Sequence, residues 1–174
     1  RAEETLRIQA RTDPLTGLMN RDAVLNELAE RLADESRATV AVLYIDLDRF
    51  KTVNDVLGHN AGDELLMQAA ARIQRAVGAG GQVARFGGDE FLVVCDAGAN
   101  QELPVQLAEA VLAAFNESFR FGKDEFAITT SIGLACAPDD GLRPQQLIQN
   151  ADTAMYDTKH RTRNAWQAFT PELA

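Results

Sequence analysis

The sequence contains few cysteines, no long apolar run and no excess of positive charge. Its two cysteines, in 174 residues, are too few for a disulfide framework. Both lie in segments typical of strands, so we expect buried thiols in a reducing compartment such as the cytoplasm. No apolar run approaches the length of a membrane span, and the charged start has no signal-peptide core, so we expect no membrane contact by this domain. Lys and Arg number 17 against 26 Asp and Glu, which argues against a nucleic-acid partner.

The remaining composition is typical of one globular domain. At 46% hydrophobic and 25% charged, the chain can bury a full core without disulfides, and wholesale disorder is excluded. The net charge of −9 leaves room for a small anionic ligand only if a metal ion and a few cations offset the field. Because the chain begins with Arg, we expect it to be a piece of a longer protein.

Hydrophobic periodicity predicts an α+β fold. Apolar spacing of helical type occurs at 21–34, 60–77, 103–119 and 144–161. Strand patterns occur at 39–47, 83–86, 90–95, 125–137 and 165–169, and 1–11 is typical of the end of a connecting helix. Two helical crossovers and one hairpin predict a mixed sheet with helices packed against it rather than a doubly wound parallel sheet. The nucleotide-binding loops of such parallel folds are also absent from the sequence.

Two acidic pairs are the main candidates for chemistry. Asp46 and Asp48 lie at the end of a strand that is apolar on both faces, and strand alternation places them on one face. Asp89 and Glu90 follow the turn glycines of the predicted hairpin. Capping of local turns explains either pair alone. If the hairpin lies beside the central strand, Asp89 approaches Asp46, and their repulsion indicates a site for Mg²⁺ or Mn²⁺ completed by phosphate oxygens.

The last predicted helix supplies cations. Asp152, Tyr156, Lys159 and Arg163 are spaced to share one face of it. An exposed face with cations favoured by the helix dipole is one interpretation. The other is a phosphate site, which requires this helix end to lie beside the carboxylates.

A third group of polar residues lies between the central strand and the hairpin. Asn54 and Asp63 suit ordinary capping and first-turn roles. They also suit guanine, which offers two adjacent donors to a carboxylate and an O6 acceptor to an amide. His59, nearby, is more typical of local packing or capping than of catalysis.

The segment Arg85-Phe-Gly-Gly-Asp-Glu-Phe91 resembles the signature of GGDEF domains, the diguanylate cyclases. The resemblance covers about residues 11 to 169, with the family's motifs in the expected order. The other matching segments are Asp13-Pro-Leu-Thr-Gly-Leu-Met-Asn-Arg21, Asp46-Leu-Asp-Arg-Phe-Lys51, Asn54-Asp55, Gly58-His59, Gly62-Asp63, Leu65-Leu66 and Ser131-Ile-Gly133. The last matching block consists of Ala151-Asp152, Met155-Tyr156, Lys159 and Arg163-Asn164.

The resemblance implies a fold like that of nucleotidyl cyclases and polymerase palms, with a sheet of about five strands flanked by helices. It implies Mg²⁺-dependent (or Mn²⁺-dependent) condensation of two GTP into cyclic di-GMP, with release of two pyrophosphates. Each domain of the family binds one GTP, so a transient head-to-head homodimer is also implied. An upstream sensor module is a further expected partner.

The resemblance also implies roles for individual residues. The metal would be held by Asp46, the carbonyl of Leu47, and Asp89. The substrate would be bound by Asn54 and Asp63 at guanine, by His59 near the nucleoside, and by Lys159 and Arg163 at the phosphates. The catalytic residues would be Asp89, Glu90 as base or metal helper, and Lys51, which would stabilise charge at the reacting phosphorus.

The chain departs from the family pattern at three places. Gly78 and Gly81 stand where the family's Arg-x-x-Asp product-inhibition site would be, so we expect no feedback through that site. Thr158 and Thr162 replace a small residue and a glycine around the last motif. The segment 166–173 resembles the junction at which many such domains continue into a phosphodiesterase EAL domain.

These features predict a domain layout and an alternative function. We expect residues 1–11 to be the end of an upstream linker helix, 12–169 the GGDEF domain and 170–174 the start of a C-terminal linker. The alternative to an active cyclase is a non-catalytic GTP-binding domain that regulates an attached EAL phosphodiesterase. A purely structural role for the acidic hairpin is the third interpretation.

Overall fold

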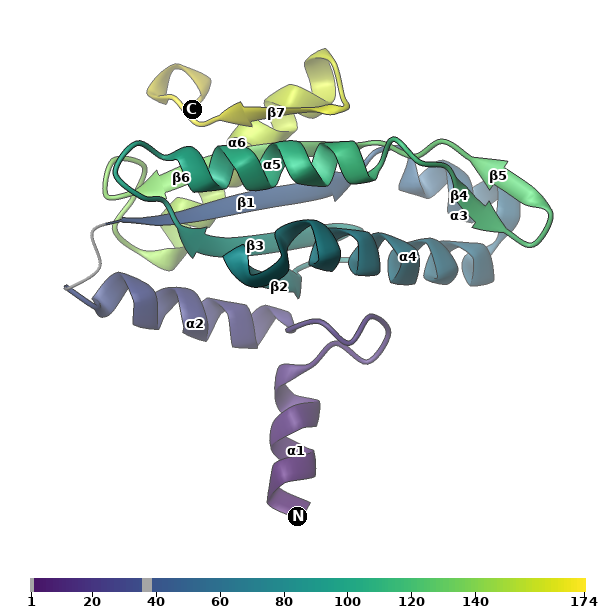
Figure 1. The fold of residues 1–174 in the computed structure, drawn as a ribbon, viewed down its shortest axis with the longest axis horizontal. Coiled ribbons are helices and arrows are strands. Elements are labelled where there is room, and N and C mark those ends of the chain that lie inside the picture. The colour runs from purple at the N-terminus through teal and green to yellow at the C-terminus, as the bar shows by residue number, and fades with distance from the viewer. Residues whose placement is uncertain (1, 36–38) are drawn as a thin grey trace.

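A computed structural model describes residues 2–35 and 39–174, so the prediction for Arg1 lies outside the described residues. A mixed sheet of five strands lies between helices on both of its faces, and the N-terminal helix stands apart from the sheet (Figure 1). The helices are α1 (Ala2–Arg11), α2 (Arg21–Ala33), α3 (Phe50–Leu57), α4 (His59–Val77), α5 (Glu102–Ala114) and α6 (Pro144–Arg161). The strands are β1 (Val40–Leu47), β2 (Gly81–Arg85), β3 (Glu90–Asp96), β4 (Phe119–Phe121), β5 (Asp124–Phe126), β6 (Thr130–Ala137) and β7 (Ala165–Ala168). Short 3₁₀ turns, η1 (Gly78–Gly80) and η2 (Pro171–Leu173), complete the described elements.

Strand β1 is the centre of the sheet. Its eight residues are all buried, which fits the unbroken apolar run in the sequence. It pairs antiparallel with β3 on one side and with β6 on the other. The strand order is β2-β3-β1-β6-β7, and β7 is parallel to β6. The predicted mixed sheet of an α+β fold is therefore confirmed.

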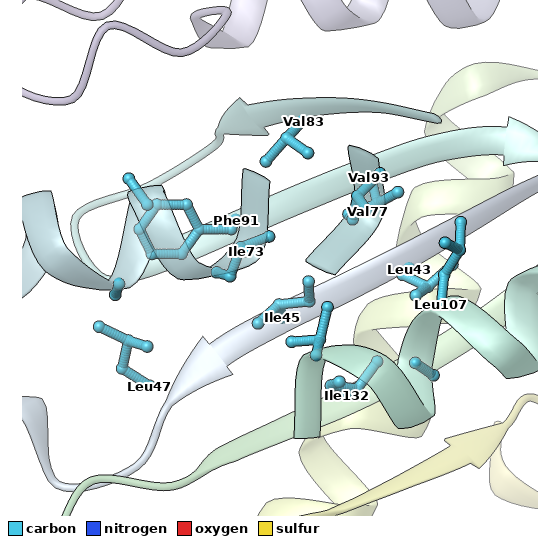
Figure 2. Close-up of a cluster of buried hydrophobic side chains, with 14 of the residues drawn as sticks. Leu43, Ile45, Leu47, Ile73, Val77, Val83, Phe91, Val93, Leu107 and Ile132 are labelled. Atoms are coloured by element: carbon cyan, nitrogen blue, oxygen red, sulfur yellow. The ribbon is translucent and has the colours of Figure 1, made fainter. Parts of the chain in front are cut away.

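The two faces of the sheet carry separate cores because side chains alternate along each strand. Leu43, Ile45 and Leu47 of β1 face α4 and α5, where they pack with residues such as Ile73 and Leu107 (Figure 2). Val42 and Tyr44 of the same strand face α2 and α6. The site described below lies at the end of this strand, between firmly packed layers.

One glycine brings helix α6 unusually close to the sheet. A Cβ atom on Gly133 of β6 would collide with the carbonyl oxygen of Ala151 and the backbone nitrogen of Met155. The helix therefore packs with its backbone directly on the strand. This close approach brings the last turns of α6 within reach of the end of β1.

Two of the predicted elements have the wrong extent. The helix predicted over 103–119 ends at Ala114, and Phe119 instead begins the small hairpin of β4 and β5. The Arg72 guanidinium of α4 donates to the carbonyl oxygens of Ala114, Glu117 and Ser118 and stacks on the Phe119 ring. Because these contacts satisfy carbonyls at the helix end, they stabilise the exit of the chain from α5.

The strand predicted over 125–137 is two strands, β5 and β6, which belong to different sheets. The helix α3 was not predicted at all. It has eight residues, of which only Val53 is buried, so it lacks an apolar stripe long enough to recognise. Among the described helices, none combines the length and the apolar character that a membrane crossing requires.

Candidate active site

The two predicted acidic pairs meet where β1 ends. Asp46 lies directly opposite Glu90 in the antiparallel pairing of β1 with β3. One residue further, the Leu47 N–H donates to the carbonyl oxygen of Asp89 at 3.2 Å. The predicted approach of the hairpin to the central strand is therefore confirmed, and the carboxylates lie close enough for Asp89 to affect the pKa of Asp46.

Asp46 is the electrostatic centre of this site. Its residue is 9% exposed, and its Oδ1 atom is buried without a hydrogen-bond partner. Burial raises the pKa of Asp46, and the negative charge of Asp89 raises it further, to about 7, against the opposing effect of Lys159. A buried carboxylate oxygen with no donor is costly, so the site is suited to a bound cation.

Lys159 supplies the positive charge of the site from α6. Its Nζ atom lies 3.1 Å from Asp46 Oδ2 and donates to the Leu47 carbonyl oxygen at 3.1 Å. The same atom is 3.8 Å from Asp48 Oδ1. The helix end thus lies beside the carboxylates, as the phosphate-site interpretation required.

The residues around Asp46 fit a hard divalent cation. The unpartnered Asp46 Oδ1, the Leu47 carbonyl and the Asp89 carboxylate are oxygen ligands of the kind that Mg²⁺ prefers. Over the described ranges, no group of three or more His, Cys, Asp or Glu side chains is arranged to hold a metal. Such a donor set fits Mg²⁺ that arrives with phosphate oxygens and water, because Mg²⁺ sites commonly use only one or two carboxylates.

Asp48 has a different environment from Asp46. Asp48 is 1% exposed, and three groups of the protein donate hydrogen bonds to its carboxylate. Thr129 Oγ1 donates to Asp48 Oδ2 at 2.6 Å, and Ser131 Oγ donates to Oδ1 at 2.7 Å. The Asn164 N–H donates to Oδ2 at 3.2 Å. Both oxygens of this carboxylate therefore accept hydrogen bonds from the protein.

Glu90 lies half-buried against Tyr44 on the α6 side of the sheet. Burial raises the pKa of Glu90, while a hydrogen bond from the Tyr44 hydroxyl lowers it and the charges of Asp89 and Asp152 raise it. The net direction is upward, which keeps a carboxyl closer to the range useful for proton transfer. Burial, together with the negative charges of Glu90, Asp152 and Asp46, raises the pKa of Tyr44, so the phenol stays protonated as a donor.

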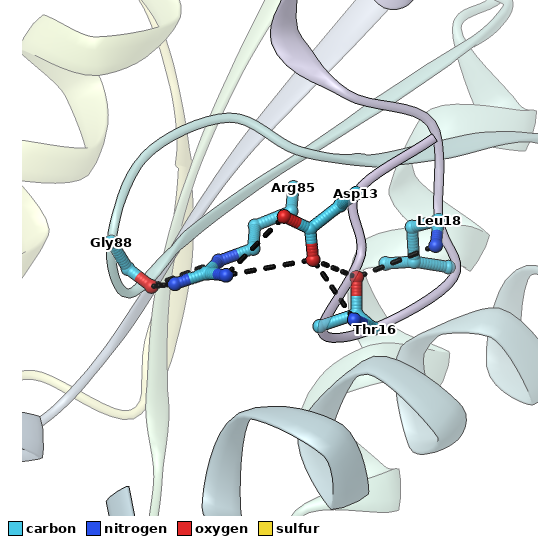
Figure 3. Close-up of polar contacts among 5 residues, drawn as sticks. All are labelled: Asp13, Thr16, Leu18, Arg85 and Gly88. Carbon is cyan, nitrogen blue, oxygen red and sulfur yellow. Dashed lines mark hydrogen bonds and ion pairs between the residues drawn. The ribbon is translucent and has the colours of Figure 1, made fainter. Parts of the chain in front are cut away.

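The turn of the hairpin is tied to the loop before α2 through Arg85 (Figure 3). The Arg85 guanidinium donates to the Gly88 carbonyl oxygen at 2.9 Å and pairs with Asp13 Oδ1 at 3.3 Å. Asp13 in turn accepts from the Thr16 hydroxyl at 2.7 Å. Although burial acts to raise the pKa of Asp13, the Thr16 hydrogen bonds and Arg85 outweigh it, and the pKa lies below 3.8.

The candidate guanine readers come from α3 and the start of α4. A Cβ on Gly62 would collide with Asn54 Oδ1, so the Asn54 side chain lies directly over this glycine. Asp63, the next residue, is exposed, as is His59 at the helix start. The Asn54 side chain of α3 therefore contacts the residue that directly precedes Asp63 in α4.

The remaining candidates are solvent-facing. Lys51 is exposed in the first turn of α3. Arg163 is exposed too, but the prediction that it lies on the face of the last helix is wrong. Helix α6 ends at Arg161, and Arg163 and Asn164 form a left-handed turn with φ of 53° and 49°. The Arg163 side chain therefore leaves from a turn anchored beside Asp48.

Sequence reasoning missed three participants in this arrangement. The sequence pattern shows Tyr44 only as part of an apolar strand, and Arg85 only as part of a motif. Asp48 was grouped with Asp46 as half of an acidic pair. A signal for Tyr44 was available in strand alternation, which places residues 44 and 46 on the same face.

Comparison with known proteins agrees with this geometry. Residues 10–165 match the family model described as diguanylate cyclase, GGDEF domain. An uncharacterized signaling protein of Caulobacter vibrioides is 41% identical over 99% of this chain, which covers 22% of that protein. The cyclic di-GMP phosphodiesterase PdeR of Escherichia coli is 39% identical over 99% of this chain and 26% of its own length. A bifunctional diguanylate cyclase/cyclic di-GMP phosphodiesterase of Pseudomonas aeruginosa, MucR, is 38% identical over 99% of the chain and 25% of its own length.

Solved structures show the same fold. The GGDEF domain of TpbB (YfiN) from Pseudomonas aeruginosa superposes with a TM-score of 0.88 at 35% identity, covering 93% of this chain and 96% of that one. A sensory box/GGDEF family protein from Caulobacter crescentus has a TM-score of 0.81 at 42% identity, covering 87% and 99%. The chain spans about a quarter of the length of the curated relatives named above.

Proposed function

The chain belongs to the GGDEF domain family, and on that premise we propose that it is a diguanylate cyclase. In this proposal two copies, each holding one GTP, meet face to face. Each ribose 3′-hydroxyl oxygen forms a bond to the α-phosphorus of the opposite GTP, and the bond from that phosphorus to the β-phosphate oxygen breaks. The products are one cyclic di-GMP and two pyrophosphates.

One observation carries this proposal. Asp46 Oδ1 is buried without a partner beside Asp89, at the meeting of β1 with the Gly-Gly turn. A site that only stabilised the fold would have no reason to bury an unsatisfied Asp46 oxygen beside a second, partly exposed carboxylate. We propose that Asp46, the Leu47 carbonyl and Asp89 hold Mg²⁺, or Mn²⁺ in its place. When bound, such an ion supplies Lewis-acid stabilisation of phosphate charge and lowers the pKa of a hydroxyl nucleophile.

The protein's own side chains perform the remaining work. Asn54 and Asp63 bind the guanine edge, with His59 near the nucleoside. Lys159 and Arg163 bind phosphate oxygens and stabilise the charge that develops on the departing pyrophosphate. Lys51, on the first turn of α3, stabilises charge at the reacting phosphorus. Positioning and charge neutralisation of this kind account for most of the catalysis in phosphoryl transfer.

Glu90 is proposed to assist proton removal from the attacking 3′-hydroxyl or to help bind the metal. Its upward-shifted pKa and its hydrogen bond with Tyr44 support the first role. The Tyr44 hydroxyl holds the carboxyl on the side of the sheet that carries Asp46. Loss of that hydroxyl would leave Glu90 free to rotate away from the site.

The test is product formation from GTP. The domain is incubated with GTP and Mg²⁺ at protein concentrations high enough for dimers, and cyclic di-GMP and pyrophosphate are quantified by chromatography and mass spectrometry. Parallel reactions use Asp89→Ala and Asp46→Asn. Product from the parent and none from the variants supports the proposal.

A second candidate is a GTP-binding domain that regulates an attached EAL phosphodiesterase without turnover. It is favoured by the similarity to PdeR, whose name gives a phosphodiesterase, and by the small share of each relative that this chain spans. Magnesium-dependent GTP binding without product, under the same conditions, would support this candidate. Failure to bind GTP would contradict both.

A further inference from the structure

We infer that Asp48 is a positioning residue that fixes the phosphate-binding cations of α6, rather than a ligand of the metal. The inference rests on the proposed function, because it concerns where Lys159 and Arg163 stand relative to a bound triphosphate. Its basis is the way the Asp48 carboxylate connects the end of β1 to the turn that follows α6.

Both oxygens of the Asp48 carboxylate already accept hydrogen bonds from the protein. Oδ2 accepts from the Thr129 hydroxyl and the Asn164 N–H, and Oδ1 accepts from the Ser131 hydroxyl. The side chain is almost completely buried. Asp46, two residues earlier, has the opposite pattern, with one oxygen buried and unpartnered. The two carboxylates therefore differ: Asp48 is held by donors of the protein, whereas Asp46 has an oxygen available to a cation.

The turn held by Asp48 needs such an anchor. Arg163 and Asn164 both adopt left-handed backbone angles, with φ of 53° and 49°. Two consecutive residues with side chains in this region are strained, and such a conformation persists only when surrounding contacts fix it. The bond from the Asn164 N–H to a buried carboxylate is charge-assisted and is therefore stronger than a neutral contact.

The same carboxylate lies near Lys159 and binds the residue that follows Arg163. Asn164 follows Arg163 directly, so the anchored amide fixes the backbone from which the Arg163 side chain leaves. Asp48 Oδ1 is 3.8 Å from Lys159 Nζ, close enough to bias the ammonium toward the end of β1. Thr129 and Ser131 hold the carboxylate from the other side, at the start of β6. One buried carboxylate thus connects the end of β1, the start of β6 and the turn after α6, and we infer that it fixes the positions of both cations.

The test compares ligands that differ only in their phosphates. Binding of 3′-deoxy-GTP, which lacks the attacking hydroxyl and cannot react, is measured with Mg²⁺ by calorimetry, and binding of 3′-deoxy-GMP is measured in parallel. Asp48→Asn should weaken triphosphate binding about tenfold while leaving monophosphate binding within about twofold of the parent. Thr129→Val is the matched control, because it removes one hydrogen bond to the same carboxylate oxygen but leaves the Asn164 anchor in place.

The outcomes separate the inference from the proposed function. A parent domain that binds no triphosphate would remove the proposed function and this inference with it. A parent that binds normally, with Asp48→Asn either unchanged or weakened equally for both ligands, would overturn the inference alone. A selective triphosphate loss that Thr129→Val reproduces in full would also overturn it.

A second variant keeps the question open to experiment if Asp48→Asn does not fold. Replacing the backbone amide of Asn164 with an ester by semisynthesis removes the N–H donor. The bonds of Asp48 to Thr129 and Ser131 remain. The same selective loss of triphosphate binding is expected, and unchanged binding would overturn the inference.

Discussion

The ammonium of Lys159 lies 3.1 Å from Asp46 Oδ2 and 3.1 Å from the carbonyl oxygen of Leu47. These are two of the three groups proposed to hold Mg²⁺. A cation on a flexible side chain thus neutralises the carboxylate, and a metal ion has to compete with it. In the proposed function, a bound triphosphate would offer the lysine a new partner and end this competition.

We therefore predict that Lys159→Met strengthens the binding of Mn²⁺ alone, without nucleotide, by about tenfold, because one positive charge leaves the vicinity of two carboxylates. Electron paramagnetic resonance of free Mn²⁺ measures this directly. Lys51→Met is the control, since Lys51 is exposed and forms no ion pair with a carboxylate among the described residues. Equal Mn²⁺ affinity in all three proteins would contradict the prediction.

The raised pKa of Asp46 predicts a dependence of stability on pH. The folded-state pKa is about 7, above the ordinary value of 3.8. Between these values the folded protein binds more protons than the unfolded chain, so the free energy of unfolding falls as pH rises through this window. Urea unfolding in EDTA should show lower stability at pH 8 than at pH 5, and Asp46→Asn should flatten the dependence. A wild-type slope equal to that of the variant would show that other groups dominate.

Gly62→Ala should impair guanine recognition without unfolding the domain. The new methyl group collides with Asn54 Oδ1, so the amide must move. Helix α4 itself gains about 1 kcal/mol of propensity from the change, so stability is retained. We expect the preference for GTP over ATP, measured as a ratio of dissociation constants, to fall about tenfold.

The control for that experiment is a double-mutant cycle. In an Asn54→Ala background, Gly62→Ala should cause little further loss, because the displaced group is already absent. Additive losses would mean that the glycine acts through some contact other than Asn54.

Product inhibition through an Arg-x-x-Asp site should be absent, and the local geometry opposes its restoration. Gly78 has φ of 55°, which side chains rarely adopt, and a Cβ on Gly81 would lie 2.8 Å from the Val94 carbonyl oxygen. Steady-state assays should show no inhibition at low cyclic di-GMP concentration. The double substitution Gly78→Arg with Gly81→Asp should lower the free energy of unfolding by about 1–3 kcal/mol. Strong inhibition of the parent would contradict the first expectation.

The cysteines should be unreactive in the folded state. Burial raises the pKa of the Cys95 and Cys136 thiols to about 12 each, with added effects of neighbouring groups, so almost no thiolate exists at pH 8. A disulfide-exchange reagent should therefore label neither residue in native buffer and both in urea. Rapid labelling of the native protein would show that the strands open more readily than their packing implies.

Most of the fold could be predicted from the sequence because its elements have strong patterns. The uninterrupted apolar run ending at Asp46 predicts the central strand, and the stripe of α4 predicts the longest helix. The end of α5 could not be predicted, because it depends on Arg72 of another helix reaching the carbonyls after Ala114. Helix α3 escaped prediction because a short helix with one buried residue has no periodic signal.

The sequence predicts which residues form the candidate site better than it predicts where they lie relative to one another. The approach of Asp89 to Asp46 followed from pairing a hairpin with the central strand. Helical spacing predicts Arg163 on the face of the last helix, but α6 ends two residues earlier. The turn that follows is held by the hydrogen bond from the Asn164 N–H to Asp48. A bond between residues 48 and 164 has no local signature, because it depends on how distant segments pack.

The contacts of Arg85 have a mechanical consequence. One guanidinium joins the carboxylate of Asp13, two residues after the N-terminal helix α1, to the carbonyl of Gly88, one residue before the acidic tip. We therefore expect rotation or tilting of α1 to be transmitted through Arg85 to the hairpin turn that carries Asp89. Such a movement would change the distance between the Asp89 and Asp46 carboxylates without a rearrangement of the sheet.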